Sequence, residues 1–324
     1  MSAPVEEGAR LLREGGLVAF PTETVYGLGA DASNSTAVAK IFALKGRPAD
    51  HPLIVHVGGP ESLREWARDV PPAAFALAES FWPGPLTMIL KRAARVPDAV
   101  TGGQDSVGLR CPSHPMAQEL LREFARIGSG AIAAPSANKF GHVSPTTAEH
   151  VRDEFGAGLF LLDGGACEVG LESTIVDLSR GAPVLLRPGA VTREDIARVM
   201  GIDPRDRDVE APRASGTLAA HYAPATAMAL LGAQALDREV RSLQNVAVLA
   251  LREAPYAARA TTWIDAGSDP ARYGHALYAN LRKLDASGAK RILVESPPAT
   301  VEWEAVNDRL MRAAAGAGRI DDEP

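Results

Sequence analysis

Short apolar runs alternate with helix-like stretches along the chain from Gly8 to about Pro188. An apolar run of roughly 4–8 residues that stops at Pro, Gly or polar residues predicts a buried strand. Such runs are Leu17–Phe20, Leu53–Val57, Leu86–Leu90, Val107–Arg110, Ala131–Ala133, Leu159–Leu162, Thr174–Asp177 and Val184–Leu186. Helical spacing predicts helices over Ala37–Leu44, Glu61–Arg68, Ala73–Phe81 and Met116–Ala125. The first of these can begin at Asn34 or Ser35 and end at Gly46. Short strands with intervening helices predict the α/β class, with one large mixed, twisted sheet.

The apolar pattern breaks between Arg205 and Arg213, where charged residues and proline are typical of a linker. After Pro224 the alternation resumes. We expect strands at Met228–Leu231, Val246–Leu251, Trp263–Ala266 and Arg291–Glu295, and helices at Ala233–Leu243, Pro270–Asp285 and Val301–Ala315. The chain is therefore predicted to contain a first domain over residues 1–204, a linker over 205–225 and a smaller, Rossmann-like α/β domain over 226–324.

Composition narrows the class of protein further. The 324 residues, 46% hydrophobic and 23% charged, suit two globular domains. The formal net charge of −6 predicts that direct nucleic-acid binding is weak or absent. Cys111 and Cys167 form no C-x-x-C pair, which indicates reduced thiols in a cytoplasmic protein. The uncharged stretch Ala214–Leu236 is rich in alanine and contains Pro224, so we expect no membrane span.

One glycine motif suggests a nucleotide site that its context does not support. Residues Gly27–Ala32 match G-x-G-x-x-A, the pattern of dinucleotide-binding turns. Such glycines should follow the first strand directly, but six residues, Pro21–Tyr26, come between. The chain also contains no G-x-x-x-x-G-K-[ST], G-x-S-x-G or H-E-x-x-H motif. We therefore expect no nicotinamide cofactor, no Walker-type nucleotide site and no zinc protease site.

Cations and hydroxyls follow the predicted strands, where open α/β sheets bind ligands. The cationic candidates are Lys45, Arg47, Arg110 and Arg187, and the hydroxyl candidates are Thr24, Ser106, Ser136, Ser144 and Ser173. Taken singly, each has an ordinary structural explanation as a helix-end charge or a turn residue. If the strand ends converge, these groups form one site for a polyanion, because arginine forks and hydroxyls suit phosphate oxygens.

The strings that carry these groups resemble the Sua5/YrdC family, the threonylcarbamoyl-AMP synthases. The matching strings, in chain order, are Phe20–Leu28, Lys45–Pro48, Pro52–His56, Phe81–Thr87, Ser136–Asn138, Ser144–Thr146, Glu172–Asp177 and Arg187–Gly189. The resemblance covers roughly the first 190 residues. The segment ending in His221–Pro224 and the second α/β domain resemble the longer, Sua5-type architecture. The fold implied is an N-terminal YrdC-like domain followed by a C-terminal Sua5 domain.

The resemblance implies that L-threonine, bicarbonate and ATP give threonylcarbamoyl-AMP and pyrophosphate, a nucleotidyltransferase reaction. Other proteins would then use the product to modify tRNA. The implied catalytic residues are Lys45, Arg47 and Arg187. The implied threonine ligands are Thr24, His56, Arg110 and Ser173. The implied ATP ligands are Lys45, Arg47, Ser106, Ser136, Asn138, Ser144 and Arg187, with Tyr222 closing over the nucleotide from the linker. Mg²⁺ would accompany ATP, and the sequence reveals no ligands for it.

The chain departs from the family pattern at three places. His51 stands where the family often has Asn, Ser106 replaces a frequent Thr, and Ser215–Leu218 replaces a P-G-M string. Two other functions remain open. One is a carbamoyl-adenylate-forming enzyme, although two lone cysteines cannot make the zinc fingers of such proteins. The other is a double-stranded RNA-binding regulatory protein, against which the net charge argues.

Overall fold

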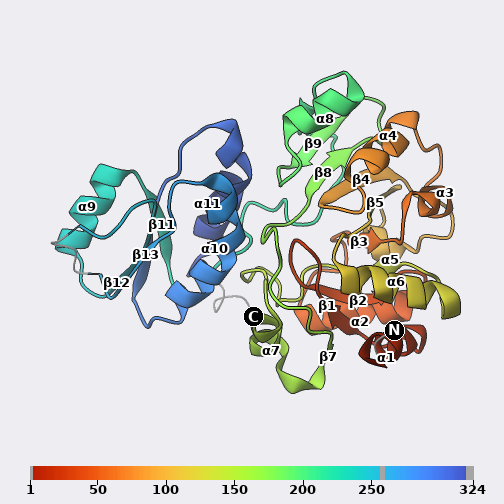
Figure 1. Ribbon diagram of the computed structural model, residues 1–324, viewed down its shortest axis with the longest axis horizontal. Coiled ribbons are helices and arrows are strands. Elements are labelled where there is room, and N and C mark those ends of the chain that lie inside the picture. Colours follow the sequence, from red (N-terminus) through yellow and green to blue (C-terminus); the bar gives the residue numbers. More distant parts are fainter. Residues whose placement is uncertain (1–2, 256–259, 319–324) are drawn as a thin grey trace. The chain divides into compact units, whose positions relative to one another are not determined.

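The computed structural model describes residues 3–255 and 260–318 and divides the chain into two compact units (Figure 1). The first unit comprises Met1–Lys139, Pro145–Glu168 and Glu172–Thr217. The second comprises Phe140–Ser144, Val169–Leu171 and Leu218–Pro324. The segment predicted as a linker, residues 205–225, is therefore shared between the units, with its first part in the first unit. The functional boundaries 1–204, 205–225 and 226–324 stay predictions.

Within the described residues of the first unit, ten strands form one mixed sheet in the order β10-β9-β8-β4-β5-β3-β6-β2-β1-β7. This confirms the predicted large mixed sheet. Strand β5 has one parallel neighbour, β3, and one antiparallel neighbour, β4. The strands are β1 (Val18–Phe20), β2 (Gly27–Asp31), β3 (Ile54–His56), β4 (Leu86–Lys91), β5 (Ser106–Arg110), β6 (Ile132–Ala133), β7 (Phe160–Leu161), β8 (Thr174–Asp177), β9 (Val184–Arg187) and β10 (Arg205–Asp206).

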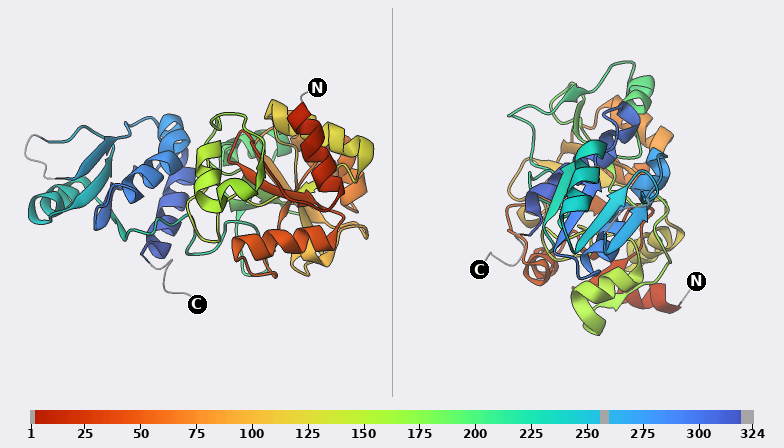
Figure 2. Two further views of the ribbon diagram at one scale, coloured as in Figure 1. Left: turned by 90° about the horizontal axis from the view of Figure 1, so that it is seen from below. Right: turned by 90° about the vertical axis from the view of Figure 1, so that its left-hand side faces the viewer.

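Helices cover both faces of the β1–β2 end of this sheet, with α1 and α6 on one face and α2 on the other (Figure 2). The helices are α1 (Ala3–Arg13), α2 (Ser35–Lys45), α3 (Leu63–Trp66), α4 (Pro72–Phe81), α5 (Asp98–Thr101), α6 (Pro115–Ile127), α7 (Ala148–Phe155) and α8 (Arg193–Met200), with 3-10 turns at Pro60–Ser62 and Gly156–Gly158. The Asn34 side chain accepts two backbone N–H groups at the start of α2, and Gly46, at φ 64°, ends it. Both helix signals predicted from the sequence are confirmed.

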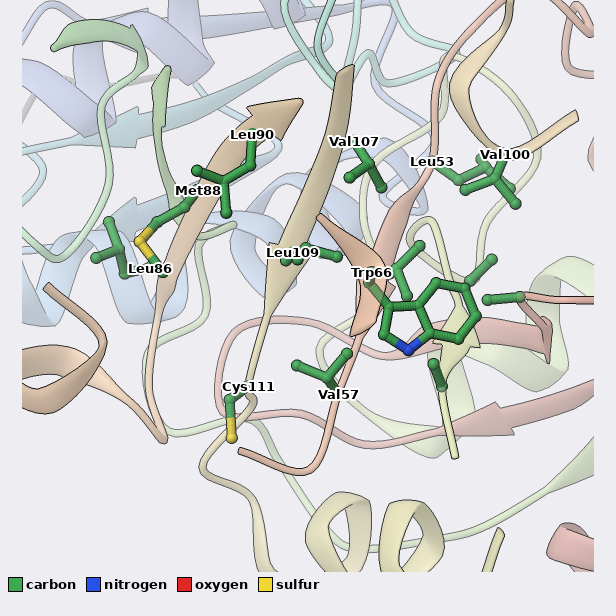
Figure 3. Close-up of a cluster of buried hydrophobic side chains, with 14 of the residues drawn as sticks. Leu53, Val57, Trp66, Leu86, Met88, Leu90, Val100, Val107, Leu109 and Cys111 are labelled. Carbon is green, nitrogen blue, oxygen red and sulfur yellow. The ribbon is translucent and has the colours of Figure 1, made fainter. Parts of the chain in front are cut away.

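The central strands carry an apolar face and a polar face, because successive side chains alternate. The apolar face belongs to the main core of the first unit, shown in Figure 3, and includes Leu86, Met88, Leu90, Val107 and Leu109. The alternate positions, among them Thr87 on β4 and Arg110 on β5, project from the opposite face. The same alternation that builds the core therefore carries the polar side chains discussed below.

Gly27 and Gly29 lie within strand β2 and not in a strand-to-helix turn, so the dinucleotide-binding interpretation is excluded. A Cβ atom at Gly29 would lie 2.6 Å from Cγ2 of Ile132 and 2.9 Å from Cε1 of Phe20. The glycines leave room for the Phe20 ring, whose centroid lies 5.9 Å from that of the His56 ring. Gly27 and Gly29 therefore allow the close packing of the Phe20 ring next to His56.

The second unit is a parallel sheet in the order β11-β14-β12-β13 over its described residues. Helix α9 lies on one face, and α10 and α11 lie on the other (Figures 1 and 2). This arrangement confirms the smaller α/β domain that was predicted. The elements are β11 (Met228–Leu231), α9 (Ala233–Ser242), β12 (Val246–Ala250), β13 (Thr262–Asp265), α10 (Pro270–Asp285), β14 (Arg291–Glu295), a 3-10 turn (Val301–Trp303) and α11 (Glu304–Gly316).

Two predicted elements need correction. The helix predicted over Glu61–Arg68 is a 3-10 turn followed by the single turn α3, which ends at Trp66. The segment predicted as a linker begins with β10, which pairs in parallel with β9. Both residues of β10 are charged and exposed, so no apolar pattern in the sequence predicts this strand. Only its pairing with β9 defines it. Across the described residues, no helix combines the length and the apolar character needed to span a bilayer.

Candidate functional site

Three neighbouring strands place polar side chains in one row on the face opposite the main core. His56, at the end of β3, is paired with Arg110 at the end of β5, and Arg110 is paired with Thr87 on β4. Residues paired across strands project from the same face of a sheet. His56, Arg110 and Thr87 are 3%, 4% and 0% exposed. We call these three residues the polar row.

The Arg110 guanidinium is held by a buried carboxylate. Its Nη2 donates to Oε1 of Glu23 at 2.7 Å, and the two side chains are 5% and 4% exposed. The other oxygen of Glu23 accepts the backbone N–H of Ser113 at 2.9 Å. Nε of Arg110 is buried and meets no hydrogen-bond acceptor among the residues described. This donor is therefore available to an anionic oxygen of a ligand.

His56 is a neutral side chain in this site. Burial, and secondarily the charge of Arg110, lowers the pKa of His56 to about 3. Its Nδ1 is buried and has no partner in the described part of the chain. Because buried polar atoms are nearly always paired, two unpartnered nitrogens on residues paired across strands mark a place for a small polar ligand.

Thr24 presents an oxygen that can only accept. The Thr22 hydroxyl donates its one proton to the carbonyl of Val25 at 2.6 Å. In the 2.9 Å contact between the Thr22 and Thr24 hydroxyls, Thr24 must therefore be the donor. The lone pairs of the Thr24 oxygen suit an ammonium or hydroxyl donor of a ligand, and they repel a carboxylate.

Ser173 connects the polar row to Arg187. The Ser173 hydroxyl lies 2.7 Å from that of Thr87 and accepts Nη2 of Arg187 at 3.2 Å. Nε of Arg187 donates to the Ser173 carbonyl at 3.0 Å. The arginine and the serine thus hold each other, and both are nine-tenths or more buried.

Close packing between two loops fixes this pair. The Thr174 hydroxyl donates to the Val191 carbonyl at 2.6 Å and accepts the Val191 N–H at 3.1 Å. A Cβ at Gly189 would lie 2.5 Å from the Thr174 nitrogen, so only glycine fits there. The R-P-G and E-S-T strings are therefore one packed unit that presents Ser173 and Arg187 together.

Ser215 connects Arg187 to Arg47. Its carbonyl accepts Nη1 of Arg187 at 2.8 Å, and its hydroxyl lies 3.4 Å from Nη2 of Arg47. That hydroxyl donates to the Pro52 carbonyl at 2.8 Å, and the same carbonyl accepts Nη2 of Arg47 at 3.0 Å. The two guanidinium groups are therefore bridged by a single residue.

Lys45 is buried beside the loop that contains the S-A-N string. Its Nζ donates to the carbonyls of Ser136, at 2.7 Å, and Asn138. Burial, and secondarily the charge of Arg47, holds the pKa of Lys45 well below its usual range. An ammonium group has three donors, so one is left for a ligand, and an anion next to it would favour the charged form.

A small pocket, partly open to solvent and with room for about one water molecule, adjoins this cluster in the first unit. Its apolar lining includes Ile54, Ile89, Ile175 and Ala214, and its polar lining includes Ser106 and Ser215. A mainly apolar lining with a few polar groups is typical of ligand sites, although a nucleobase needs more room than this pocket has.

The first unit thus contains most of the predicted site residues. These are Thr24, Lys45, Arg47, His56, Ser106, Arg110, Ser136, Asn138, Ser173 and Arg187. Ser144 and Tyr222 belong to the second unit, where the Tyr222 ring lies 5.6 Å from that of Tyr278 and 5.5 Å from the Arg309 guanidinium carbon. The predicted nucleotide contacts of Ser144 and Tyr222 stay predictions.

Three residues of the cluster, Glu23, Thr87 and Ser215, are not predicted from the sequence. Glu23 and Thr87 lie inside matched strings, but a search for cations and hydroxyls after strands passes over an acid and a mid-strand threonine. Ser215 was noted only as a departure from the family pattern. Its position next to both arginines follows from the fold and not from its neighbours in sequence.

The cysteines are not activated, and the described acids form no metal-binding cluster. Burial raises the pKa of Cys111 to about 11 and that of Cys167 to about 12, so neither thiol is an activated nucleophile. Within the residues that the structure describes, no group of three or more His, Cys, Asp or Glu side chains could hold a metal ion.

The fold and site define the class as a mixed-sheet α/β domain with a buried cluster of arginine, lysine and hydroxyl groups, joined to a parallel α/β domain. Two family models cover nearly all of it. The Sua5, YciO and YrdC family model, described as telomere recombination, matches residues 10–189, and the model described as threonylcarbamoyl-AMP synthase, C-terminal domain, matches 191–315. The chain belongs to the Sua5/YrdC family.

Relatives agree with this assignment over almost the whole length. A threonylcarbamoyl-AMP synthase of Pyrococcus abyssi is 39% identical over 94% of this chain and 92% of its own length. One of Bacillus subtilis is 39% identical over 96% of this chain and 93% of its own length. The crystal structure of P. abyssi Sua5 complexed with L-threonine superposes with a TM-score of 0.87 at 38% identity, covering 96% of this chain and 94% of that one.

Proposed function

We propose that this protein is a threonylcarbamoyl-AMP synthase, which converts L-threonine, bicarbonate and ATP to threonylcarbamoyl-AMP and pyrophosphate. The observation that carries the proposal is the continuous connection from His56 and Arg110 through Thr87 and Ser173 to Arg187. It joins a place for a small amino acid to a place for phosphate. The full-length relatives of the same name support it.

The polar row suits threonine. The free Nε donor of Arg110 matches the threonine carboxylate, and the lone pair of Thr24 matches the ammonium or hydroxyl group. His56, as a neutral ring, adds a hydrogen-bonding nitrogen without adding charge. Ser173 completes the predicted threonine set at the side nearest Arg187.

The cationic part suits the triphosphate. Arg187 donates to the Ser215 carbonyl through Nη1, and a phosphate oxygen is a stronger, charged acceptor for a guanidinium donor. Arg47 and Lys45 lie at the end of the same helix and supply further donors. Ser106 lines the small, mainly apolar pocket, which would have to widen to admit the adenine ring. Mg²⁺ would arrive on the phosphates, since the described residues hold no acidic cluster of their own.

The chemistry needs positioning and no protein nucleophile. Threonine ammonium and bicarbonate give the carbamate, water and one proton. A carbamate oxygen then bonds to the α-phosphorus while the bond from that phosphorus to the pyrophosphate oxygen breaks, which makes the protein a nucleotidyltransferase. Arginine and lysine donors stabilise the charge on the phosphoryl oxygens, and fixed subsites raise the effective concentration of the reactants. The proposal also includes an ATP contact by Ser144 and closure of Tyr222 over the nucleotide. It further includes a cytoplasmic location and delivery of the product to tRNA-modifying proteins.

The test is pyrophosphate release with ATP, bicarbonate and each amino acid in turn. We expect release with threonine and a product that contains threonine, carbonate carbon and AMP by mass spectrometry. Arg110→Ala and Arg187→Ala should each abolish release while the circular dichroism spectrum is unchanged. Undiminished release in both variants would contradict the assigned site.

Two alternatives give other results in the same experiment. A carbamoyl-adenylate-forming enzyme would release pyrophosphate with carbamoyl phosphate in place of threonine. A double-stranded RNA-binding regulator would shift RNA in a gel with a strong salt dependence and would release no pyrophosphate.

A further inference from the structure

Glu23 is a buried carboxylate whose two oxygens are both committed. The residue is 3% exposed, one oxygen accepts Nη2 of Arg110 at 2.7 Å, and the other accepts the N–H of Ser113 at 2.9 Å. A carboxylate held at both oxygens cannot turn about its last bond. Glu23 is therefore a fixed support for the arginine next to it.

This support determines which donors Arg110 has left. A guanidinium is planar, with its five N–H donors in a rigid arrangement, so fixing Nη2 also fixes the direction of Nε. Nε is the donor without a partner among the described residues. Without Glu23, the guanidinium could rotate toward other oxygens, and its direction toward a ligand would be lost.

The same contact sets the charge beside the ligand. Arg110 and Glu23 together carry no formal net charge, and His56 is neutral because its pKa is about 3. Arg187, another arginine of the site, instead donates hydrogen bonds to the neutral oxygens of Ser173 and Ser215. The polar row is thus matched to a ligand of zero net charge, such as an amino-acid zwitterion, and not to an anion.

We propose that Glu23 is a positioning residue of the threonine subsite, which aims Arg110 at the amino-acid carboxylate and makes the subsite select a zwitterion over an anion. This inference rests on the proposed function and adds a residue and a selectivity to it. Glu23 acts through Arg110 and need not touch threonine.

Glu23→Gln tests the proposal, because glutamine has the same shape but no charge and can accept with only one of its two terminal atoms. We expect the KM for threonine to rise about 10- to 100-fold while the Kd for ATP stays within about twofold. A competing ligand, 2,3-dihydroxybutanoate, has a hydroxyl in place of the ammonium and carries one negative charge. The preference for threonine over this anion should fall at least about tenfold in Glu23→Gln, as judged by calorimetry.

Asp177→Asn is the matched control. Asp177 is also fully buried, with one oxygen accepting Nε of Arg180 and the other accepting the N–H of Ser179, both at 2.9 Å. Asp177→Asn should leave unchanged both the KM for threonine and the preference for threonine over 2,3-dihydroxybutanoate. Glu23→Asp keeps the charge but has a shorter side chain. It should retain the preference for the zwitterion and show a smaller rise in the KM for threonine. If Glu23→Gln does not fold, Glu23→Asp takes its place in the test.

The outcomes separate the two claims. Product formation by the wild type together with an unchanged threonine KM in the Glu23 variants would overturn the positioning role and leave the proposed function intact. Equal losses of threonine and ATP binding in those variants would also overturn it, because they indicate a general structural role. No threonine-dependent product with the wild type would overturn the proposed function itself.

Discussion

Replacing His56 by glutamine should make the first unit less sensitive to acid. In the folded protein burial and the Arg110 charge hold His56 neutral down to about pH 3, whereas in the unfolded chain a histidine takes up its proton near pH 6.5. Between these two values the unfolded state binds one more proton than the folded state. Lowering the pH in this window therefore favours unfolding of the wild type, and glutamine removes the effect.

The size of the effect follows from the width of that window. One bound proton changes the free energy of unfolding by about 1.4 kcal/mol per pH unit. At pH 5, about 1.5 units below the unfolded pKa, His56 should cost the wild type about 2 kcal/mol compared with pH 8. The absolute stabilities of the two proteins can differ for other reasons, so the quantity to compare is how their difference changes with pH.

The measurement is urea unfolding of wild type and His56→Gln from pH 8 to pH 4.5, followed by pulsed hydrogen-exchange mass spectrometry of peptides from β3 and β5. These peptides report on the first unit. His275→Gln, at an exposed position, is the control and should behave as the wild type does. A stability difference between wild type and His56→Gln that stays constant within about 0.5 kcal/mol over this range would refute the argument.

Three further predictions concern the scaffold of the site, and urea unfolding with threonine and ATP titrations checks each. Gly29→Ala should destabilise by about 1–3 kcal/mol, because the new Cβ would lie 2.6 Å from Cγ2 of Ile132; unchanged stability would contradict the close packing. Thr174→Val should cost about 1–3 kcal/mol and weaken ATP binding, because both backbone groups of Val191 lose their partner; undisturbed ATP binding would separate this loop contact from the site. Asn34→Ala should cost about 1 kcal/mol through the lost cap of α2 without changing threonine affinity, and a threonine effect would show that the cap reaches the site.

Strands that bury a continuous apolar run can be predicted from the sequence. Strands that form through contacts with other parts of the fold cannot. Thr174–Asp177 and Met228–Leu231 were predicted with their observed bounds. Strand β2 was not predicted, because its sequence, Gly-Leu-Gly-Ala-Asp, has glycines where an alternating strand would have side chains. Those glycines are explained by side chains of the neighbouring strands that pack over them, the Phe20 ring and Ile132 among them.

The residue types of the site were predictable, whereas their partnerships were not. Lysine, arginine and hydroxyl groups after strands predicted a polyanion site, and the structure joins Arg187 and Arg47 through Ser215. The pairing of Glu23 with Arg110 spans 87 positions of the chain and depends on how β5 lies in the sheet. Nothing near either residue in the sequence specifies it.

The pairing of Glu23 with Arg110 gives the two parts of the site different net charges. Glu23 neutralises Arg110, so the polar row can be built and buried before any ligand arrives. Lys45 instead hydrogen-bonds to neutral carbonyls, and its lowered pKa records the cost of burying a cation beside Arg47 without an anion in contact with its ammonium. A bound triphosphate would supply that anion and a zwitterion would not. The unequal distribution of acids therefore suits a site for two ligands, one of zero net charge and one strongly negative, held side by side.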